Sequence, residues 1–443
     1  MKTQVEELSP VKRKLTIEVE AEEIDKRLNK ALREIGKKTR IPGFRPGKAP
    51  IGILERYFGR QIKEEVARDL IGETLPKAFE DTDLAPLAFP ELESGALERG
   101  KAFKYSAVLE VRPKIELGDY LGVEIEKEEA SVTDEEVNER IEQILKAHGK
   151  LEPLSEPRPI KEGDFAILDY KAFEGDNPLE GIQATNFLVN VGAGDFHLDF
   201  EKALVGLKVG DEKEITAKFE EDHYHKALAG KEVRFQVKVI DIKEMKLPEL
   251  TDDFAKQLDS ELESVDDLKN KVREIIEKEK KAKIDKEAQK RLLTEITKDL
   301  DIDLPETLVE SELAKAIDTV SQNLARSGSS LEKAGLSVEK LREELRPSAE
   351  ERVKNMLVLT EIAQREGITV SDEDVEEAFK EMAASMGQDP QVIRRYYEAK
   401  QLMEPFRERL LEEKALNYLM EHANIKVKTA TENSRFRDDR ERE

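Results

Sequence analysis

From Val265 to about Leu300 the sequence keeps a helical spacing of apolar residues without one glycine or proline. The pattern begins with Val265, Leu268, Val272, Ile275 and Ile276. At 1.5 Å per residue such a helix is roughly 50 Å long, which is more than a compact domain needs. This run therefore predicts an elongated helical part rather than one globular core.

The surrounding stretch, 247–430, is expected to form this elongated helical domain, with further helices beginning near Pro305, Val338 and Ser371. Residues 431–443 lack aliphatic positions and alternate in charge, which predicts a disordered tail. A chain of 443 residues is too long for one hydrophobic core, so two to four domains are expected. Aromatic residues make up only 5%, which favours helix and confines any sheet to particular stretches.

Residues 1–112 have the pattern of a compact α+β domain. Alternating residues predict strands over 10–20 and 101–111, and Gly36 stands where the glycine after a helix end would stand. The segment 41–52 is so dense in proline and glycine that it must form an ordered loop, and a helix resumes over 51–82.

Charge separates this part from the rest of the chain. The net charge is −24, yet residues 1–112 hold 22 Lys and Arg against 20 Asp and Glu. Within 26–48 there are nine basic residues and one acidic residue, Glu34. The nine are Lys26, Arg27, Lys30, Arg33, Lys37, Lys38, Arg40, Arg45 and Lys48. Such a patch directs an acidic protein to a polyanion, although a solvated helix face followed by a basic loop would look the same.

Residues 113–150 are expected to form a connector that belongs to the helical domain, with a capping box at Thr133 and Glu136 opening its helix. A proline-rich link then leads into residues 151–246. Seven of the sixteen phenylalanines fall within 161–245, in short segments that predict a small antiparallel sheet. The expected strands are 164–170, 186–191, 212–219 and 232–240.

The sequence gives little support for catalysis through a reactive side chain. There is no cysteine, which excludes disulfides and thiol catalysis, and no cofactor-binding motif. His223 and His225 could share a strand face, but without a third ligand at a recognisable spacing we expect no metal site. An apolar aromatic pocket could still speed rotation about an X–Pro bond, because binding the twisted amide better than the planar one is sufficient. The same aromatic residues could equally be an ordinary core.

The loop sequence carries a resemblance. Residues Gly43, Phe44, Arg45, Pro46, Gly47 and Lys48, followed by Ala49 and Pro50, resemble the ribosome-docking loop of the trigger factor family, whose signature is G-F-R-x-G-K-x-P. The resemblance extends to about residue 430. It implies a multidomain α+β protein with an α+β ribosome-binding domain, an FKBP-like antiparallel sheet domain and an elongated helical chaperone domain.

The resemblance also implies the partners. These are the large ribosomal subunit near the peptide exit tunnel, through ribosomal protein and rRNA, and nascent or unfolded polypeptides. A homodimer off the ribosome, a cytoplasmic location and links to protein export and cell division come with the family. The first residues lack the apolar region of a signal peptide, and no window approaches the roughly 18 apolar residues of a membrane span, so we expect no membrane partner. No cofactor is implied.

The isomerase pocket is inferred in the same way. The residues that match the FKBP-like pocket are Tyr170, Phe187, His197, Phe200, Tyr224 and Phe235. Two positions depart from the family pattern, because His197 stands where relatives carry an apolar residue and Leu179 where they carry an aromatic one.

The resemblance therefore predicts a ribosome-associated chaperone with peptidyl-prolyl cis-trans isomerase activity. The alternatives are a holding chaperone with little or no isomerase activity, a multidomain isomerase whose helices only add substrate affinity, and a helical scaffold with an RNA-binding head.

Overall fold

The computed structural model describes residues 1–39, 41–42, 44, 48–175, 177–194, 196–220, 228–327, 329–332 and 334–428. The chain forms two compact units, each interrupted in sequence. The first contains Met1–Val123, Leu292–Val320 and Glu339–Ala423, and the second contains Glu124–Arg291, Ser321–Val338 and Asn424–Glu443. In the part of the chain that the structure describes, no helix is both long and apolar enough to cross a membrane.

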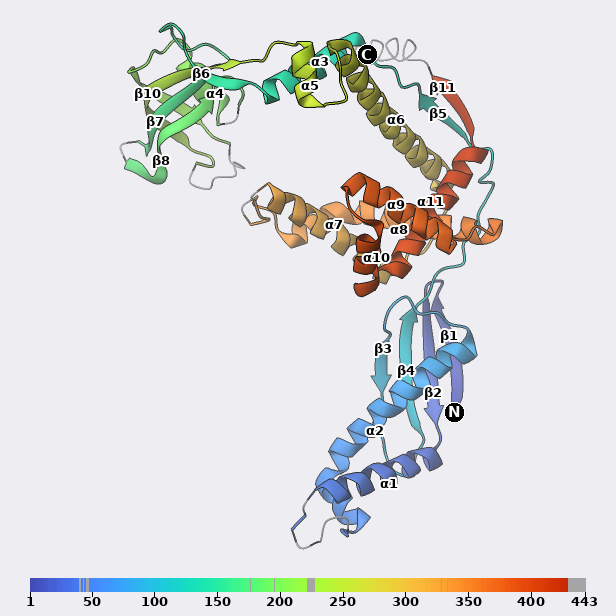
Figure 1. Ribbon diagram of the computed structural model, residues 1–443. Coiled ribbons are helices and arrows are strands. Elements are labelled where there is room, and N and C mark those ends of the chain that lie inside the picture. Colours follow the sequence, from blue (N-terminus) through green and yellow to red (C-terminus); the bar gives the residue numbers. More distant parts are fainter. Residues whose placement is uncertain are drawn as a thin grey trace. The chain divides into compact units, whose positions relative to one another are not determined.

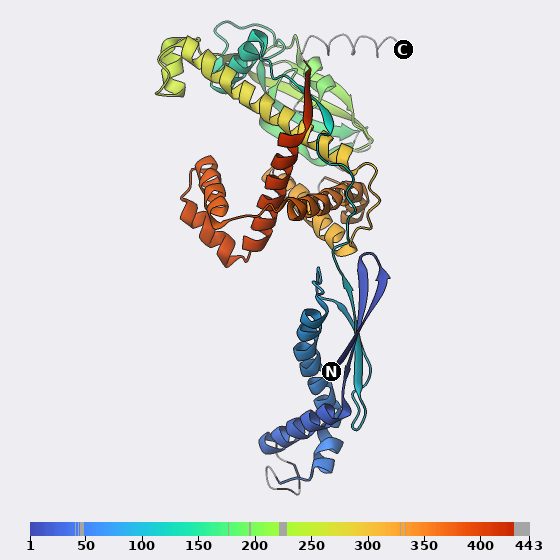
Figure 2. The same cartoon turned by 90° about the vertical axis from the view of Figure 1, so that its right-hand side faces the viewer.

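The N-terminal part of the first unit is an antiparallel sheet covered by two helices. Its strands are β1 (Lys2–Ser9), β2 (Lys12–Val19), β3 (Glu91–Ser94) and β4 (Phe103–Glu110), in the order β1-β2-β4-β3. The helices α1 (Ala21–Lys38) and α2 (Ile51–Thr82) lie on one face (Figures 1 and 2). Alternate residues of β2 and β4 are buried against these helices, which confirms both predicted strands.

Gly36 does not end its helix, contrary to the prediction. Helix α1 continues to Lys38 and its C-cap is Thr39. Gly36 is buried instead, and a Cβ atom there would stand 2.9 Å from Cδ1 of Leu54. The missing side chain therefore lets α2 approach α1 closely at the point where the loop leaves the domain.

The other helices of the first unit lie in the C-terminal sequence. They are α7 (Glu306–Arg326, of which residues to Val320 belong here), α8 (Val338–Glu366), α9 (Asp372–Met386), α10 (Pro390–Ala399) and α11 (Met403–His422). The predicted helix starts near Pro305, Val338 and Ser371 are confirmed. Phe379 of α9 stacks on Phe406 of α11 with ring centroids 4.6 Å apart, and Tyr397 of α10 packs edge-on against both.

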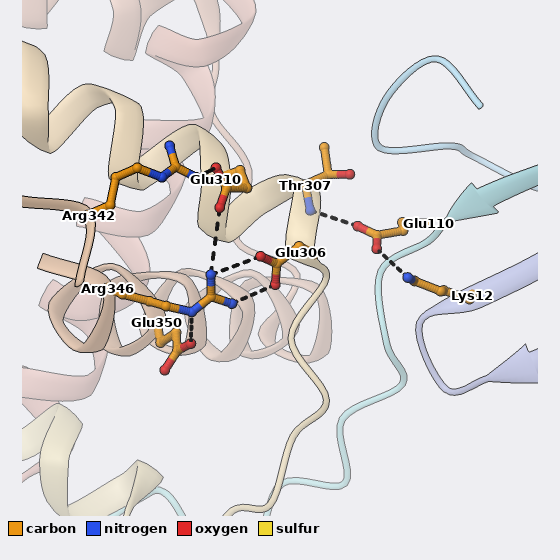
Figure 3. Close-up of polar contacts among 8 residues, drawn as sticks. All are labelled: Lys12, Glu110, Glu306, Thr307, Glu310, Arg342, Arg346 and Glu350. Atoms are coloured by element: carbon orange, nitrogen blue, oxygen red, sulfur yellow. Dashed lines mark hydrogen bonds and ion pairs between the residues drawn. The ribbon is translucent and has the colours of Figure 1, made fainter. Parts of the chain in front are cut away.

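The sheet and helices of this unit meet at a carboxylate. Glu110, the last residue of β4, accepts a hydrogen bond of 2.8 Å from the backbone N–H of Thr307 in the first turn of α7 (Figure 3). Lys12 stands 3.5 Å from the other oxygen of Glu110. A helix N-terminus carries unpaired N–H groups and partial positive charge, so this carboxylate caps α7. Nearby, the guanidinium of Arg346 donates two hydrogen bonds to the carboxylate of Glu306, at 2.9 and 2.7 Å (Figure 3).

The second unit contains a five-stranded antiparallel sheet. Its strands are β6 (Lys150–Pro153), β7 (Phe165–Glu174), β8 (Asn177–Asn190), β9 (Glu212–Lys218) and β10 (Glu232–Lys246). They follow the order β6-β10-β7-β8, with β9 paired to β10. The short helix α4 (Leu198–Leu204) packs on this sheet through Phe200 and Leu204. All four predicted strands are present, and β7, β8 and β10 are longer than expected.

The same unit joins distant parts of the sequence. Helix α3 (Asp134–Ala147) packs against α5 (Asp252–Leu258) and α6 (Val265–Thr297) through Val137, Ile141, Leu268 and Val272. The capping box at Thr133 and Glu136 is confirmed. Strands β5 (Glu124–Glu128) and β11 (Asn424–Lys428) pair in parallel, which the sequence did not predict.

Candidate functional sites: a docking tip, an aromatic pocket and a helical groove

The docking tip is the segment between α1 and α2. Of its predicted residues, Phe44 and Lys48 are described, whereas Gly43, Arg45, Pro46 and Gly47 lie outside the described residues. Phe44 is 38% exposed, and its backbone N–H donates to the carbonyl of Ile41 at 3.1 Å. Ile41 itself is buried in the domain core. A half-exposed ring is thus held by a turn whose first residue is anchored.

The basic residues around the tip divide into two groups. Lys30, Arg33, Lys37, Lys38 and Lys48 are exposed. Arg27 is less available to bind a polyanion, because its guanidinium already pairs with Glu23 at 2.7 Å and Glu73 at 2.8 Å. The hydrogen bonds that its guanidinium donates to Glu73 and Glu23 raise the pKa of Arg27. Arg27 therefore fixes α1 to α2, and the sequence count overstated the patch by this residue.

The aromatic pocket lies between α4 and the sheet of the second unit. The rings of Tyr170, Phe187, Phe200 and Phe235 converge there, with Tyr170 5.3 Å from Phe187 and 5.9 Å from Phe235. Phe200 and Phe235 are fully buried, while Tyr170 and Phe187 are partly accessible. Tyr224, which was also predicted, is outside the described part of the chain.

Phe196 is the residue that the predicted set missed. Its ring centroid lies 4.9 Å from that of Phe200 and 5.7 Å from those of Tyr170, Phe187 and Phe235. It therefore contacts every described ring of the cluster and is itself partly accessible. Its position directly before His197, where the chain departs from the family pattern, was the signal that could have identified it.

His197 lies at the edge of this pocket. Its ring packs on Phe219 with centroids 4.8 Å apart, and its Nε2–H donates to the carbonyl of Lys218 at 3.2 Å. That bond leaves Nδ1 as the acceptor nitrogen, and this atom is buried without a hydrogen-bond partner among the described residues. Leu179 packs against the same core from β8.

A buried carboxylate holds the loop that carries Phe196 and His197. Glu201 of α4 is fully buried. Its Oε2 accepts from the backbone N–H groups of Gly192 and Gly194 at 3.0 and 2.7 Å, and its Oε1 accepts from Phe196 at 2.9 Å. Three hydrogen bonds converge on one side chain, so the backbone at Gly192, Gly194 and Phe196 is held before any substrate arrives.

The pocket offers binding and desolvation rather than a nucleophile. The rings pack edge-to-face on one another and leave Tyr170, Phe187 and Phe196 partly accessible. An amide held against this aromatic surface would lose contact with water, which reduces the charge separation that favours planarity. No group of three or more His, Asp or Glu side chains among the described residues could hold a metal ion. His223 and His225 lie outside those residues.

A groove of about 760 Å³ runs between α9 and α11 in the first unit. Its apolar lining includes Met382, Met386 and Leu410, and Met386 is 60% exposed. Asp374 lies at the rim, where hydrogen bonds from Lys414 and Ser371 lower its pKa to about 2. Most of the lining is polar or charged, and the two methionines with Leu410 form a smaller apolar part that could make weak contacts with unrelated apolar segments.

Three family models match long parts of the chain. The family model described as bacterial trigger factor protein matches residues 1–144, and the model of the trigger factor C-terminus matches residues 264–421. The model of FKBP-type peptidyl-prolyl cis-trans isomerase matches residues 156–240, which contain the aromatic pocket.

Full-length relatives give the same result. A trigger factor of Halalkalibacterium halodurans is 36% identical over 92% of this chain and 96% of its own, and one of Geotalea uraniireducens is 35% identical over 96% and 98%. A solved structure of the trigger factor chaperone, at 25% identity, covers 95% of this chain and 99% of its own with a TM-score of 0.48.

Proposed function

Because the chain belongs to the trigger factor family, we propose that this ribosome-associated chaperone docks through the tip around Phe44. The observation that carries the proposal is a ring left 38% exposed on a turn anchored by buried Ile41. Exposed Lys37, Lys38 and Lys48 stand beside it. The ring supplies an apolar anchor, and the lysines supply charge for rRNA phosphate or acidic ribosomal protein side chains.

Ribosome co-sedimentation tests this docking. Phe44→Ala combined with Arg45→Ala should abolish binding to the large subunit, whereas Leu8→Ala, which removes an exposed apolar side chain from β1, should leave it intact. Binding should also weaken as salt rises, because phosphate contacts release counterions. Full binding by the double variant would refute the assignment of the tip.

The second part of the proposal is isomerase activity in the FKBP-type domain. The support is the convergence of Tyr170, Phe187, Phe196, Phe200 and Phe235 on one partly accessible pocket. Rotation there requires no reactive side chain, only better binding of the twisted X–Pro bond than of the planar one. The His197 ring lies at the pocket edge, packed on Phe219 and hydrogen-bonded to the carbonyl of Lys218.

Refolding of a protein limited by a trans-to-cis proline step measures this activity. Wild type should accelerate the slow phase, and Phe196→Leu should reduce the acceleration while preserving most of the buried volume. A chain that prevents aggregation but leaves the slow phase unchanged at every concentration would be a holding chaperone without isomerase activity, which is the alternative function.

The remaining assignments follow from the family and from the helical groove. Accessible Met382 and Met386 suit nascent and unfolded polypeptides. We place this activity in the cytoplasm, near the peptide exit tunnel, with a homodimer as the form off the ribosome. Links to protein export and cell division belong to the same proposal. Cross-linking of an arrested nascent chain to α9 and α11 tests the client surface, and its absence there would contradict it.

A further inference from the structure

A second groove lies on the N-terminal domain and is lined by none of the tip residues. It runs between α2 and the segment around β3 and has a volume of about 890 Å³. The helix contributes small residues, Gly59, Ala67 and Gly72, which leave room along its surface. The opposite wall contains Leu92 and Phe89, whose ring is 81% exposed. Such an exposed phenylalanine beside a deep groove marks an apolar contact surface.

The groove also presents a strand edge. In the four-stranded sheet the order is β1-β2-β4-β3, so β3 has a neighbour on one side only. Leu92 and Ser94, both in β3, line the groove. In Figure 1, β3 lies at the outer edge of the sheet beside α2. An unpaired edge beside an apolar hollow is the arrangement in which a domain binds an extended peptide by adding a strand.

Charge on the groove is opposite to that of the whole chain. Arg60, Lys63 and Arg68 line it along α2, together with Glu55 and Glu64. Glu55 is paired with Arg99 at 3.4 Å and Glu64 with Arg60 at 3.1 Å, so each carboxylate of the lining already has a cation beside it. The lining is therefore net basic on a protein whose net charge is −24. A basic rim around an apolar hollow selects an acidic, apolar occupant.

We infer that this groove binds an extended segment of unfolded polypeptide in which a large apolar side chain is flanked by acidic residues. The apolar side chain fills the space beside Phe89 and Leu92, the backbone pairs with β3, and the acidic residues face Lys63 and Arg68. The inference rests on the proposed function for its source of clients. The groove begins at Glu55, one helical turn after α2 leaves the docking tip, so a segment near the ribosome meets it early.

Two short labelled peptides test the inference on the full chain. Both carry a central photoreactive phenylalanine, flanked by glutamates in one and by lysines in the other. The glutamate peptide should cross-link to residues 89–97 and bind about tenfold more tightly than the lysine peptide at low salt, since the opposite charges lie within a Debye length of the rim. Equal affinities, or cross-links confined to other segments, would overturn the inference.

Two variants separate the groove from the rest of the molecule. A Cβ atom at Gly72 meets no atom within 4 Å, so a side chain can begin there, and Gly72→Trp should obstruct the groove and abolish the cross-link. Gln61→Trp, on exposed α2 surface outside the lining, is the matched control. Lys63→Glu with Arg68→Glu should instead reverse the peptide preference. Retained cross-linking in Gly72→Trp, or an unchanged preference in the charge variant, would refute the site.

Further measurements on the same variants distinguish failure of the groove inference from failure of the proposed function. Ribosome co-sedimentation and cross-linking to α9 and α11 report docking and general client binding, and both should be unaffected by Gly72→Trp. If these persist while no peptide reaches the groove, only the groove inference falls. Displacement of the glutamate peptide by a short RNA that itself cross-links to residues 89–97 would assign the basic rim to nucleic acid and overturn the inference.

Discussion

Replacing Glu201 by glutamine should loosen the loop that carries Phe196 into the aromatic pocket. The carboxylate is fully buried and accepts three backbone N–H groups, from Gly192, Gly194 and Phe196, at 2.7 to 3.0 Å. A glutamine has one acceptor oxygen, and its NH₂ group faces donors. At least one of the three N–H groups must then lose its partner inside the domain.

The magnitude follows from those contacts. Leaving one buried N–H unsatisfied costs about 1–3 kcal/mol, and the surviving bonds lose the assistance of the charge. A local cost of about 2 kcal/mol corresponds to roughly a thirtyfold increase in the population of the open loop. The cost is confined to residues 192–196, whereas the sheet keeps its own ladder. We therefore expect a local rather than a global effect.

Hydrogen exchange measures this opening directly. The amides of Gly192, Gly194 and Phe196 should exchange roughly thirtyfold faster in Glu201→Gln, in proportion to the open population. Amides in β10 should be unchanged. Glu212→Gln is the matched control, because that side chain is 67% exposed and pairs only at the surface with Lys238.

The isomerase assay supplies the second readout. A loosened loop should lower the rate through a less ordered pocket, while Glu201→Asp, which keeps the charge, should restore part of it. Unchanged exchange at all three loop amides in Glu201→Gln would refute the reasoning, because it would mean that the buried carboxylate does not order the loop.

Three further predictions concern packing, burial and capping. Gly36→Ala should destabilise the N-terminal domain by about 1 kcal/mol in calorimetry, because the new methyl group overpacks against Leu54 by more than the higher helix propensity of alanine offsets. A more stable variant would contradict this prediction. Burial raises the pKa of Glu412 above its usual 4.5 despite the ion pair with Arg352, so ionising this carboxyl lowers the stability of the fold as pH rises through the raised pKa. Glu412→Gln should therefore raise Tm at neutral pH and lose this advantage below about pH 4.5, where the glutamate is protonated as well. A gain in Tm that did not depend on pH would exclude burial of the charge as its cause. Glu110→Ala should speed amide exchange in the first turn of α7, because losing the cap destabilises that turn by about 1 kcal/mol. Glu110→Gln keeps an acceptor oxygen and should exchange more slowly than Glu110→Ala. Equal exchange in both variants would rule out the cap.

Local patterns in the sequence predicted local structure well. The capping box at Thr133 and Glu136 and the helix over 51–82 follow from short-range chemistry, since neighbouring residues satisfy the backbone groups involved. The pairing of β5 with β11 could not be read in this way. The paired residues lie 300 positions apart in the sequence, and these short charged strands carry no periodic pattern that indicates a partner.

The sites show the same division. Converging aromatics were predicted from composition and family resemblance. Phe196 was left out although it directly precedes His197, because its place in the cluster depends on a loop held by Glu201. Arg27 was counted in the basic patch, yet its partner Glu73 is distant in sequence. The prediction that Gly36 ends its helix was also wrong, because the contact with Leu54 arises only when α1 and α2 pack together.

The docking tip and the aromatic pocket share one construction, in which an accessible ring is held by a buried anchor. Ile41 anchors the turn that presents Phe44, and Glu201 anchors the loop that presents Phe196. Holding a side chain in its bound arrangement beforehand saves about 0.5–1.5 kcal/mol of ordering cost for each group. Because neither site relies on a reactive atom, this saving is a large part of what the protein contributes. Substitutions at the anchors should therefore weaken function although the anchors themselves touch no partner.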